Sequence, residues 1–226
     1  MYKILLFDAD GTLLDFQKSE ETALKKTFQR FNIPLTNVMR ERYEHINSSL
    51  WKAYEEGKID KKTVVYSRFV KLFKEFDIHE DGILFEDEYQ RELGNGAYLL
   101  PFVHDILRQL SLSFDLYIVT NGVAETQYRR LKETGIDIYF KNIFISEKIG
   151  YQKPKKEFFD YCFEQIPHFE LKDTLIIGDS LSSDIQGGIN ANIDTCWFNP
   201  NSLKNEQSLP ITYIIHDLKE LLDILL

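Results

Sequence analysis

The sequence has few of the features that mark secreted or membrane proteins. Its 226 residues include only two cysteines, Cys162 and Cys196, so a disulfide framework and a cysteine metal site are both excluded. No apolar run approaches the roughly 18 residues that a membrane span needs. The first apolar run is too short for a signal peptide, and acidic residues interrupt it. We therefore expect a soluble, cytoplasmic protein without a membrane partner.

Positive charge is also scarce. Lysine and arginine together number 27, against 36 acidic residues, which gives a formal net charge of −9. Without a basic stripe, a nucleic-acid polymer is excluded as the ligand. A small anionic ligand is still compatible with this composition, because a metal ion and one or two lysines can reverse the local field. The 43% apolar content is sufficient for a large core.

Short apolar, β-branched runs recur along the chain, and from about residue 98 they alternate with helical patterns. The predicted strands are Lys3–Phe7, Leu116–Thr120, Asn142–Ile145, Thr174–Ile177, Thr195–Phe198 and Thr212–Ile215. The predicted helices between them are Phe102–Leu110, Ala124–Thr134, Lys155–Gln165 and Ser182–Ala191. This alternation predicts an α/β fold, with a Rossmann-like parallel sheet flanked by helices.

Residues 18 to about 93 break the alternation and contain only helical patterns. The expected helices are Ser19–Phe31, Val38–Glu56, Asp60–Phe76 and Gly82–Leu93. A helical block after the first strand indicates an insertion into the α/β core. We therefore expect a discontinuous core of residues 1–15 and 97–226, and an all-helical cap domain of residues 16–96.

Two carboxylates, Asp8 and Asp10, follow the first predicted strand directly. Burying such charges costs roughly several kcal/mol unless something compensates them, and a metal ion is the usual compensation. An aspartate before Gly11 could simply form a turn. Polar residues at three other strand ends favour a chemical role, because ligands of parallel sheets bind at the carboxyl ends of the strands.

These strand ends supply the groups that phosphoryl transfer requires. A phosphate monoester is doubly anionic, so positive charge must be present before a carboxylate can approach it. Asp8 and Asp179 could hold Mg²⁺, which binds carboxylates and phosphate oxygens. Lys153 offers a further positive charge, and Thr120 offers a hydroxyl group.

The spacing of Asp8 and Asp10 allows them to share the chemistry. Residues two apart in an extended segment project to the same side. One carboxylate could attack phosphorus and form an aspartyl-phosphate. The other could give a proton to the leaving group and later take one from the attacking water.

Four segments together resemble the motifs of the haloacid dehalogenase-like hydrolase superfamily, in order and in spacing. They are Asp8-Ala9-Asp10-Gly11-Thr12, Thr120-Asn121, Lys153, and Gly178-Asp179 with Asp184. The resemblance implies that Asp8 is the nucleophile and Asp10 the general acid/base. It also implies a phosphatase with a helical cap.

The resemblance further implies which residues bind the metal and the phosphate. Magnesium would be held by the Asp8 side chain, the Asp10 main-chain carbonyl and Asp179. Asp184 matches a second acidic position, which contacts the metal directly or through water. The residues that match the phosphate-binding positions are Thr120, with Asn121 beside it, and Lys153.

More narrowly, Val119–Gly122, Gly150–Pro154 and Ile46–Trp51 resemble the pyrimidine 5′-nucleotidase branch. This implies that the partner is a small phosphorylated metabolite, a nucleoside monophosphate. Within the cap, Trp51 could stack on a base and Asn47 could bond its edge. Arg68, on the next predicted helix, completes the expected substrate set.

Two alternatives to a nucleotidase stay open. A sugar-phosphate phosphatase or mutase of the same superfamily would also have Asp10, and only cap residues would distinguish it. A regulatory phospho-acceptor module, which does not turn over, also gathers acidic residues, a threonine and a lysine at strand ends. The helical insertion disfavours this second alternative, because it has no role there.

Overall fold

The structure, a computed structural model, describes residues 2–226, and these form two compact units. The α/β unit consists of the segment that ends at Phe16 together with Ala97–Leu226. The helical unit is Gln17–Gly96. The chain thus leaves the α/β unit after its first strand and returns to it about 80 residues later.

The α/β unit is built on a parallel sheet. Its strands are β1 (Ile4–Phe7), β2 (Asp115–Thr120), β3 (Phe140–Ile145), β4 (Thr174–Gly178), β5 (Asp194–Phe198) and β6 (Tyr213–Ile215). Their order across the sheet is β3-β2-β1-β4-β5-β6, and every neighbouring pair is parallel. This confirms the predicted α/β fold class, and each predicted strand is present within two residues at either end.

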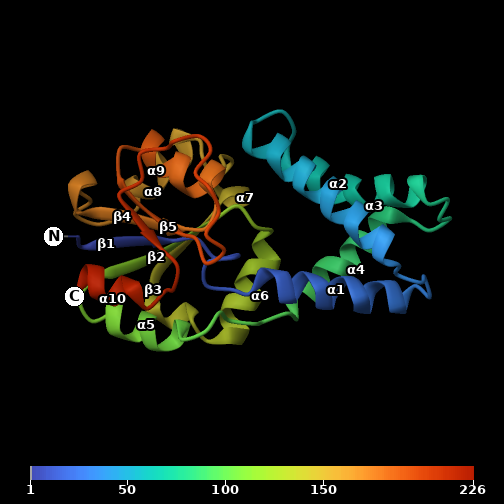
Figure 1. The fold of residues 1–226 in the computed structure, drawn as a ribbon, viewed down its shortest axis with the longest axis horizontal. Coiled ribbons are helices and arrows are strands. Elements are labelled where there is room, and N and C mark those ends of the chain that lie inside the picture. Colours follow the sequence, from blue (N-terminus) through green and yellow to red (C-terminus); the bar gives the residue numbers. More distant parts are fainter. Residues whose placement is uncertain (1) are drawn as a thin grey trace. The chain divides into compact units, whose positions relative to one another are not determined.

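Helices cover both faces of this sheet. They are α5 (Val103–Leu110), α6 (Ala124–Thr134), α7 (Ser146–Ile149), α8 (Lys156–Glu164), α9 (Gln186–Asn190) and α10 (Glu220–Leu225), with 3₁₀ turns at Asp137–Tyr139 and Leu171–Asp173. In β1, Leu5 and Phe7 pack against α5 and α10, while Ile4 and Leu6 face the opposite layer around α8. The two layers lie on either side of the strands in Figure 1. Strand β1 is buried on both faces, so its end is a rigid point in the fold.

The segment after β4 differs from the predicted helix Ser182–Ala191. A wide π-helical turn, Leu181–Ile185, precedes α9. The carbonyl oxygen of Ser180 accepts hydrogen bonds from the amides of both Asp184 (2.9 Å) and Ile185 (3.1 Å). The Ser180 amide in turn donates to Asp184 Oδ2 (3.0 Å). These bonds turn the Asp184 side chain back toward the end of β4.

The helical unit contains four helices, as the sequence predicts, with ends shifted by at most three residues. They are α1 (Phe16–Arg30), α2 (Asn37–Glu55), α3 (Lys61–Glu75) and α4 (Gly82–Gly94). Side-chain caps fix the starts of three of them: Thr36, Asp60 and Asp81 accept hydrogen bonds from first-turn amides. Aromatic rings fill the interior, among them Phe69 and Phe85, whose centroids lie 4.6 Å apart.

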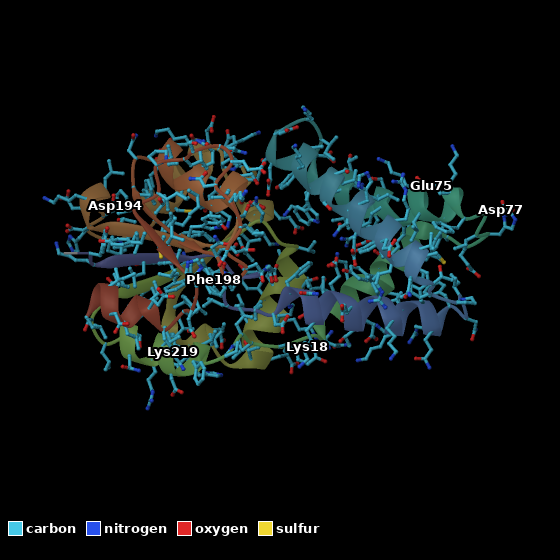
Figure 2. All side chains as sticks on the ribbon, in the orientation of Figure 1. Lys18, Glu75, Asp77, Asp194, Phe198 and Lys219 are labelled. Atoms are coloured by element: carbon cyan, nitrogen blue, oxygen red, sulfur yellow. The ribbon has the colours of Figure 1, made fainter. Side chains whose placement is uncertain are left out.

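Buried and exposed side chains are clearly separated within each unit. Phe198, at the end of β5, is buried in the core of the α/β unit, while Asp77, in the loop after α3, extends into solvent (Figure 2). Among residues 2–226, no helix is both long enough and apolar enough to cross a membrane.

Candidate active site

Three strand ends meet at the middle of the sheet. Asp8 follows β1 and Asp179 follows β4, and these strands are neighbours with Phe7 paired to Ile177. The Asp8 amide donates to the Ile177 carbonyl (2.9 Å), which continues the ladder to the first carboxylate. Thr120 ends β2 on the other side of β1. The strand order therefore brings together polar residues that lie more than 50 positions apart in the sequence.

Asp8, Asp179 and Asp184 form a group of carboxylates. Each offers one oxygen, and these three oxygens lie within 4.8 Å of one another. Three oxygen donors with negative charge are the ligands that Mg²⁺ prefers. With Lys153 beside them, the fully ionised group has a net charge of −2, so a divalent cation fits it. The donor set therefore suits magnesium.

Two glycines allow these carboxylates to pack closely. Gly11 has φ +84°, and a Cβ there would lie 2.5 Å from Asp179 Oδ2. A Cβ on Gly178 would overlap the Asp184 side chain. The Thr12 hydroxyl lies 3.3 Å from Asp8 Oδ2 and 3.4 Å from Asp179 Oδ1. Small residues at these positions are thus a steric requirement of the site.

The surroundings make ionisation of these carboxyl groups costly. Desolvation raises the pKa of Asp8 well above its usual range, and the Asp184 and Asp179 carboxylates raise it further, although Lys153 opposes them. Desolvation and the Asp184 carboxylate also raise the pKa of Asp179, to about 7. Without a cation, these carboxyl groups therefore favour their protonated forms, and a bound divalent cation would favour their ionisation.

Lys153 is buried and bonds to this group directly. Its Nζ donates to Asp8 Oδ1 (2.7 Å), Asp184 Oδ1 (2.6 Å) and the Val119 carbonyl (2.7 Å). Burial alone would lower the pKa of Lys153, but Asp184 and Asp8 outweigh burial and raise it. All three N–H donors of the ammonium group are used in this arrangement. Lys153 thus places a fixed positive charge against Asp8.

Asn121 and Thr120 have different roles in the structure. The Asn121 side chain pairs with the backbone of Lys153, donating to its carbonyl (2.9 Å) and accepting from its amide (3.0 Å). Thr120 Oγ1 accepts from the Gly122 amide (3.0 Å) and from Gln127 Nε2 (2.9 Å). Because both lone pairs of Thr120 are occupied, its hydroxyl hydrogen can be donated to a phosphate oxygen.

The Asp10 side chain lies against α6. Its Oδ2 accepts from Gln127 Nε2 (2.6 Å), and its Oδ1 is paired with the buried Arg130 guanidinium. Neither Gln127 nor Arg130 was predicted from the sequence. The available signal was their i, i+3 spacing on α6, which is the helix that follows the Thr120 motif.

The predicted substrate residues lie in the helical unit. Arg68 is buried; its guanidinium donates to both oxygens of Glu86 (2.7 and 2.6 Å) and to Asn47 Oδ1 (2.9 Å). Asn47 Nδ2 donates to Glu20 Oε1 (3.1 Å). The Trp51 ring is only partly buried, and Lys61 Nζ lies 5.4 Å from its centroid. Glu20 and Glu86 were not predicted, because buried and exposed glutamates look alike in a helical pattern.

Comparisons with known proteins agree with this geometry. A family model for haloacid dehalogenase-like hydrolases matches residues 5–198. The Bacillus subtilis protein YfnB is 50% identical over 99% of this chain and 95% of its own length. A crystal structure of YfnB bound to magnesium superposes with a TM-score of 0.94, covering 99% of this chain and 98% of the other.

Two further relatives are described as pyrimidine 5′-nucleotidases. PynA of Streptococcus pneumoniae is 40% identical over 99% of this chain and 95% of its own length. YjjG of Escherichia coli is 32% identical over 96% of this chain and 95% of its own length. These similarities extend over both units of the chain.

Proposed function

The chain belongs to the haloacid dehalogenase-like hydrolase family, and from that premise we propose that it is a magnesium-dependent phosphomonoesterase with Asp8 as its nucleophile. The observation that carries this proposal is the group formed by Asp8, Asp179 and Asp184 with Lys153 bonded to two of its members. This group lies at the ends of adjoining strands, and its oxygen donors and net negative charge suit a divalent cation. The cation, together with Lys153, would then attract a phosphate.

The metal site would use the carboxylates of Asp8, Asp179 and Asp184, with the Asp10 main-chain carbonyl as a further ligand. When bound, the ion would supply positive charge against the phosphate and the attacking carboxylate. Repulsion between two unit charges 4 Å apart amounts to about 4 kcal/mol at an effective dielectric constant of 20. Lys153 already offsets part of this repulsion, and Thr120, with Asn121 fixing the Lys153 backbone, would hold the phosphate oxygens.

The reaction would proceed in two displacements at phosphorus. An Asp8 oxygen forms a bond to phosphorus while the bond to the leaving oxygen breaks, and Asp10 gives that oxygen a proton. Water then attacks phosphorus and gives a proton to Asp10, and the bond to Asp8 breaks. Inorganic phosphate and an alcohol are the products, and Asp8 is regenerated.

The proposed substrate is a pyrimidine nucleoside 5′-monophosphate, on the similarity to PynA and YjjG. We assign its recognition to Asn47, Trp51 and Arg68 of the helical unit. The partly buried Trp51 ring has a face on which a base could stack. Asn47 and Arg68 would act through the hydrogen bonds that hold Glu20 and Glu86 in place.

Phosphate release from nucleoside monophosphates, sugar phosphates and small metabolite esters tests this proposal. We expect turnover that requires Mg²⁺, is lost with a chelator, and favours UMP or dTMP over AMP and sugar phosphates. Asp8→Asn should lower turnover by more than about 10³-fold, because it removes the covalent route. Near-normal turnover by that variant would exclude Asp8 as the nucleophile.

The same assay separates the alternatives. An isomerised sugar phosphate without phosphate release would indicate a mutase. A stable phosphoenzyme without turnover would indicate a phospho-acceptor module. A flat substrate profile would leave a general phosphatase and remove the nucleotidase assignment.

A further inference from the structure

The Asp10 carboxylate is held by two buried side chains of α6 that the two-step reaction does not itself require. Gln127 and Arg130 are each 1% exposed, whereas the Asp10 side chain is 26% exposed. Gln127 Nε2 donates to Asp10 Oδ2 (2.6 Å), and Arg130 Nη1 bonds to Asp10 Oδ1. A carboxylate at the edge of the site is thus held on both of its oxygens from the protein interior.

The two holding side chains also contact each other and the site. The Gln127 amide nitrogen donates to Thr120 Oγ1 (2.9 Å) as well as to Asp10. Its amide oxygen lies 3.5 Å from Arg130 Nη1. With its oxygen toward Arg130, the amide must present its nitrogen to Asp10 and Thr120. A Cβ on Gly122 would overlap the Gln127 side chain, so the glycine leaves room for this bridge.

We infer that Gln127 and Arg130 form a clamp that positions Asp10 for proton transfer and fixes its distance from Thr120. This inference rests on the proposed function. A general acid or base works only within hydrogen-bond reach of the group that gives or takes the proton. An unrestrained aspartate on the loop after β1 would sample several rotamers, and most of these place its oxygens elsewhere.

The clamp is compatible with both proton-transfer steps. Each carboxylate oxygen has two lone pairs, and the clamp occupies one on each oxygen. The remaining lone pairs can hold the proton that goes to the leaving oxygen and receive the proton that comes from water. Asp10 can thus exchange protons without leaving Gln127 and Arg130. A purely structural alternative is that Asp10 serves only as the counterion of a buried arginine.

The dependence of the rate on the leaving group separates these two roles. An alkoxide leaving group needs a proton from Asp10, whereas 4-nitrophenolate leaves readily without one. The experiment measures first-turnover alcohol release from the best alkyl monophosphate of the substrate screen, and nitrophenolate release from 4-nitrophenyl phosphate. The reference is Asp10→Asn, and the test variants are Gln127→Met, Arg130→Met and Arg130→Lys.

We expect Asp10→Asn to slow release from the alkyl ester by about 100-fold or more, and release from the nitrophenyl ester far less. Gln127→Met and Arg130→Met should show the same pattern at about tenfold or more, in the maximal first-turnover rate, with the substrate concentration that gives half of that rate nearly unchanged. Arg130→Lys should recover part of the loss, because it retains the positive charge. Arg129→Met is the matched control: this exposed neighbour on α6 should behave like the parent.

Each outcome has a distinct meaning. If Asp10→Asn shows the leaving-group pattern but the clamp variants slow both esters equally, or neither, the clamp inference is overturned and the proposed function stands. If Asp10→Asn lacks the pattern, the clamp inference and the proton-transfer role of Asp10 fail, although phosphatase activity stands. If the parent turns over no phosphate ester, the proposed function fails as well. Gln127→Met removes neutral donors and leaves no unpaired charge, so it decides the matter even if Arg130→Met does not fold.

Discussion

The two units each contain a group of interacting charges, and the groups differ in their balance. In the helical unit, Arg68 is matched by Glu86 through two hydrogen bonds and by Asn47 through a third. In the α/β unit, three carboxylates lie around the ammonium group of Lys153, which bonds two of them, Asp8 and Asp184. In the first group, Arg68 and Glu86 balance each other. The nearby Glu20 carboxylate is held by neutral donors from Tyr43, Asn47 and Tyr89. The second group has a net charge of −2 when fully ionised.

The neighbouring charges show the same contrast. Burial raises the pKa of Glu86, and its main charged neighbour, Arg68, opposes that rise. Burial also raises the pKa of Asp8, and its main charged neighbour, Lys153, opposes that rise, but the Asp184 and Asp179 carboxylates add to it. A balanced buried pair is therefore expected to stabilise the fold, and an unbalanced group to bind a ligand at a cost in stability.

The largest effect is expected from breaking the balanced group. Arg68→Met should lower the free energy of unfolding by about 3–5 kcal/mol, because it leaves the Glu86 charge buried without a partner. Urea unfolding, followed by Trp51 fluorescence in a Trp197→Phe background, would report this loss in the helical unit. The double variant Arg68→Met/Glu86→Leu should recover most of it.

The matched control is an exposed arginine that makes the same kind of contact. Arg42 also bonds both oxygens of a glutamate, Glu75, between α2 and α3 (2.5 and 2.8 Å). Both side chains are 40% exposed, so Arg42→Met should cost much less than Arg68→Met. Equal losses from the two substitutions would mean that burial and balance are not what stabilises the helical unit.

The next effect comes from removing a charge from the unbalanced group. Asp179→Asn should lower phosphatase turnover by about 100-fold or more, because it removes a proposed metal ligand. Substituting residues that only hydrogen-bond to metal ligands already costs about 10–100-fold in metal affinity or activity. The thermal midpoint should not fall, because one of three repelling carboxylates is gone. Asp77→Asn is the control: its side chain is exposed and its φ of 52° suits asparagine. A large fall in the midpoint of Asp179→Asn would contradict the comparison.

Local sequence patterns were sufficient for the fold and for the centre of the site. A buried apolar run followed by a polar residue defines both a strand and its end, so Asp8, Thr120 and Asp179 could be placed at one edge of the sheet. The π-helical turn was not predictable in this way. It depends on hydrogen bonds from Ser180 to Asp184 and Ile185, which a helical pattern does not encode.

The hydrogen-bond and ion-pair partners of buried polar side chains were also not predicted from the sequence. Asp10 meets Gln127 and Arg130 across 117 and 120 positions of the sequence, and only the folded sheet brings them together. In the helical unit, Arg68 and Glu86 lie on different helices, and their helical periodicity is the same as that of solvent-exposed residues. Packing between elements decides which polar residues are buried, so the i, i+3 spacing of Gln127 and Arg130 was compatible with a site but did not identify their partner.

A pH dependence of magnesium binding is the last effect expected, and measuring it leaves both charge groups intact. The pKa of Asp179 is about 7 in the folded protein, against an ordinary value of 3.8. Between these values the metal-free folded protein holds a proton that the unfolded chain does not, so its stability falls as pH rises from about 4 to 7. Magnesium must displace that proton, so its affinity should rise over the same interval, by about tenfold per pH unit for each proton displaced, and the raised pKa of Asp8 adds to the dependence. Calorimetric titration of Mg²⁺ near pH 5 and near pH 8 would measure this, with Asp179→Asn as a variant in which the part of the dependence due to Asp179 should disappear. Equal affinities at both pH values would mean that desolvation and repulsion at Asp179 are too weak to make this group a cation site.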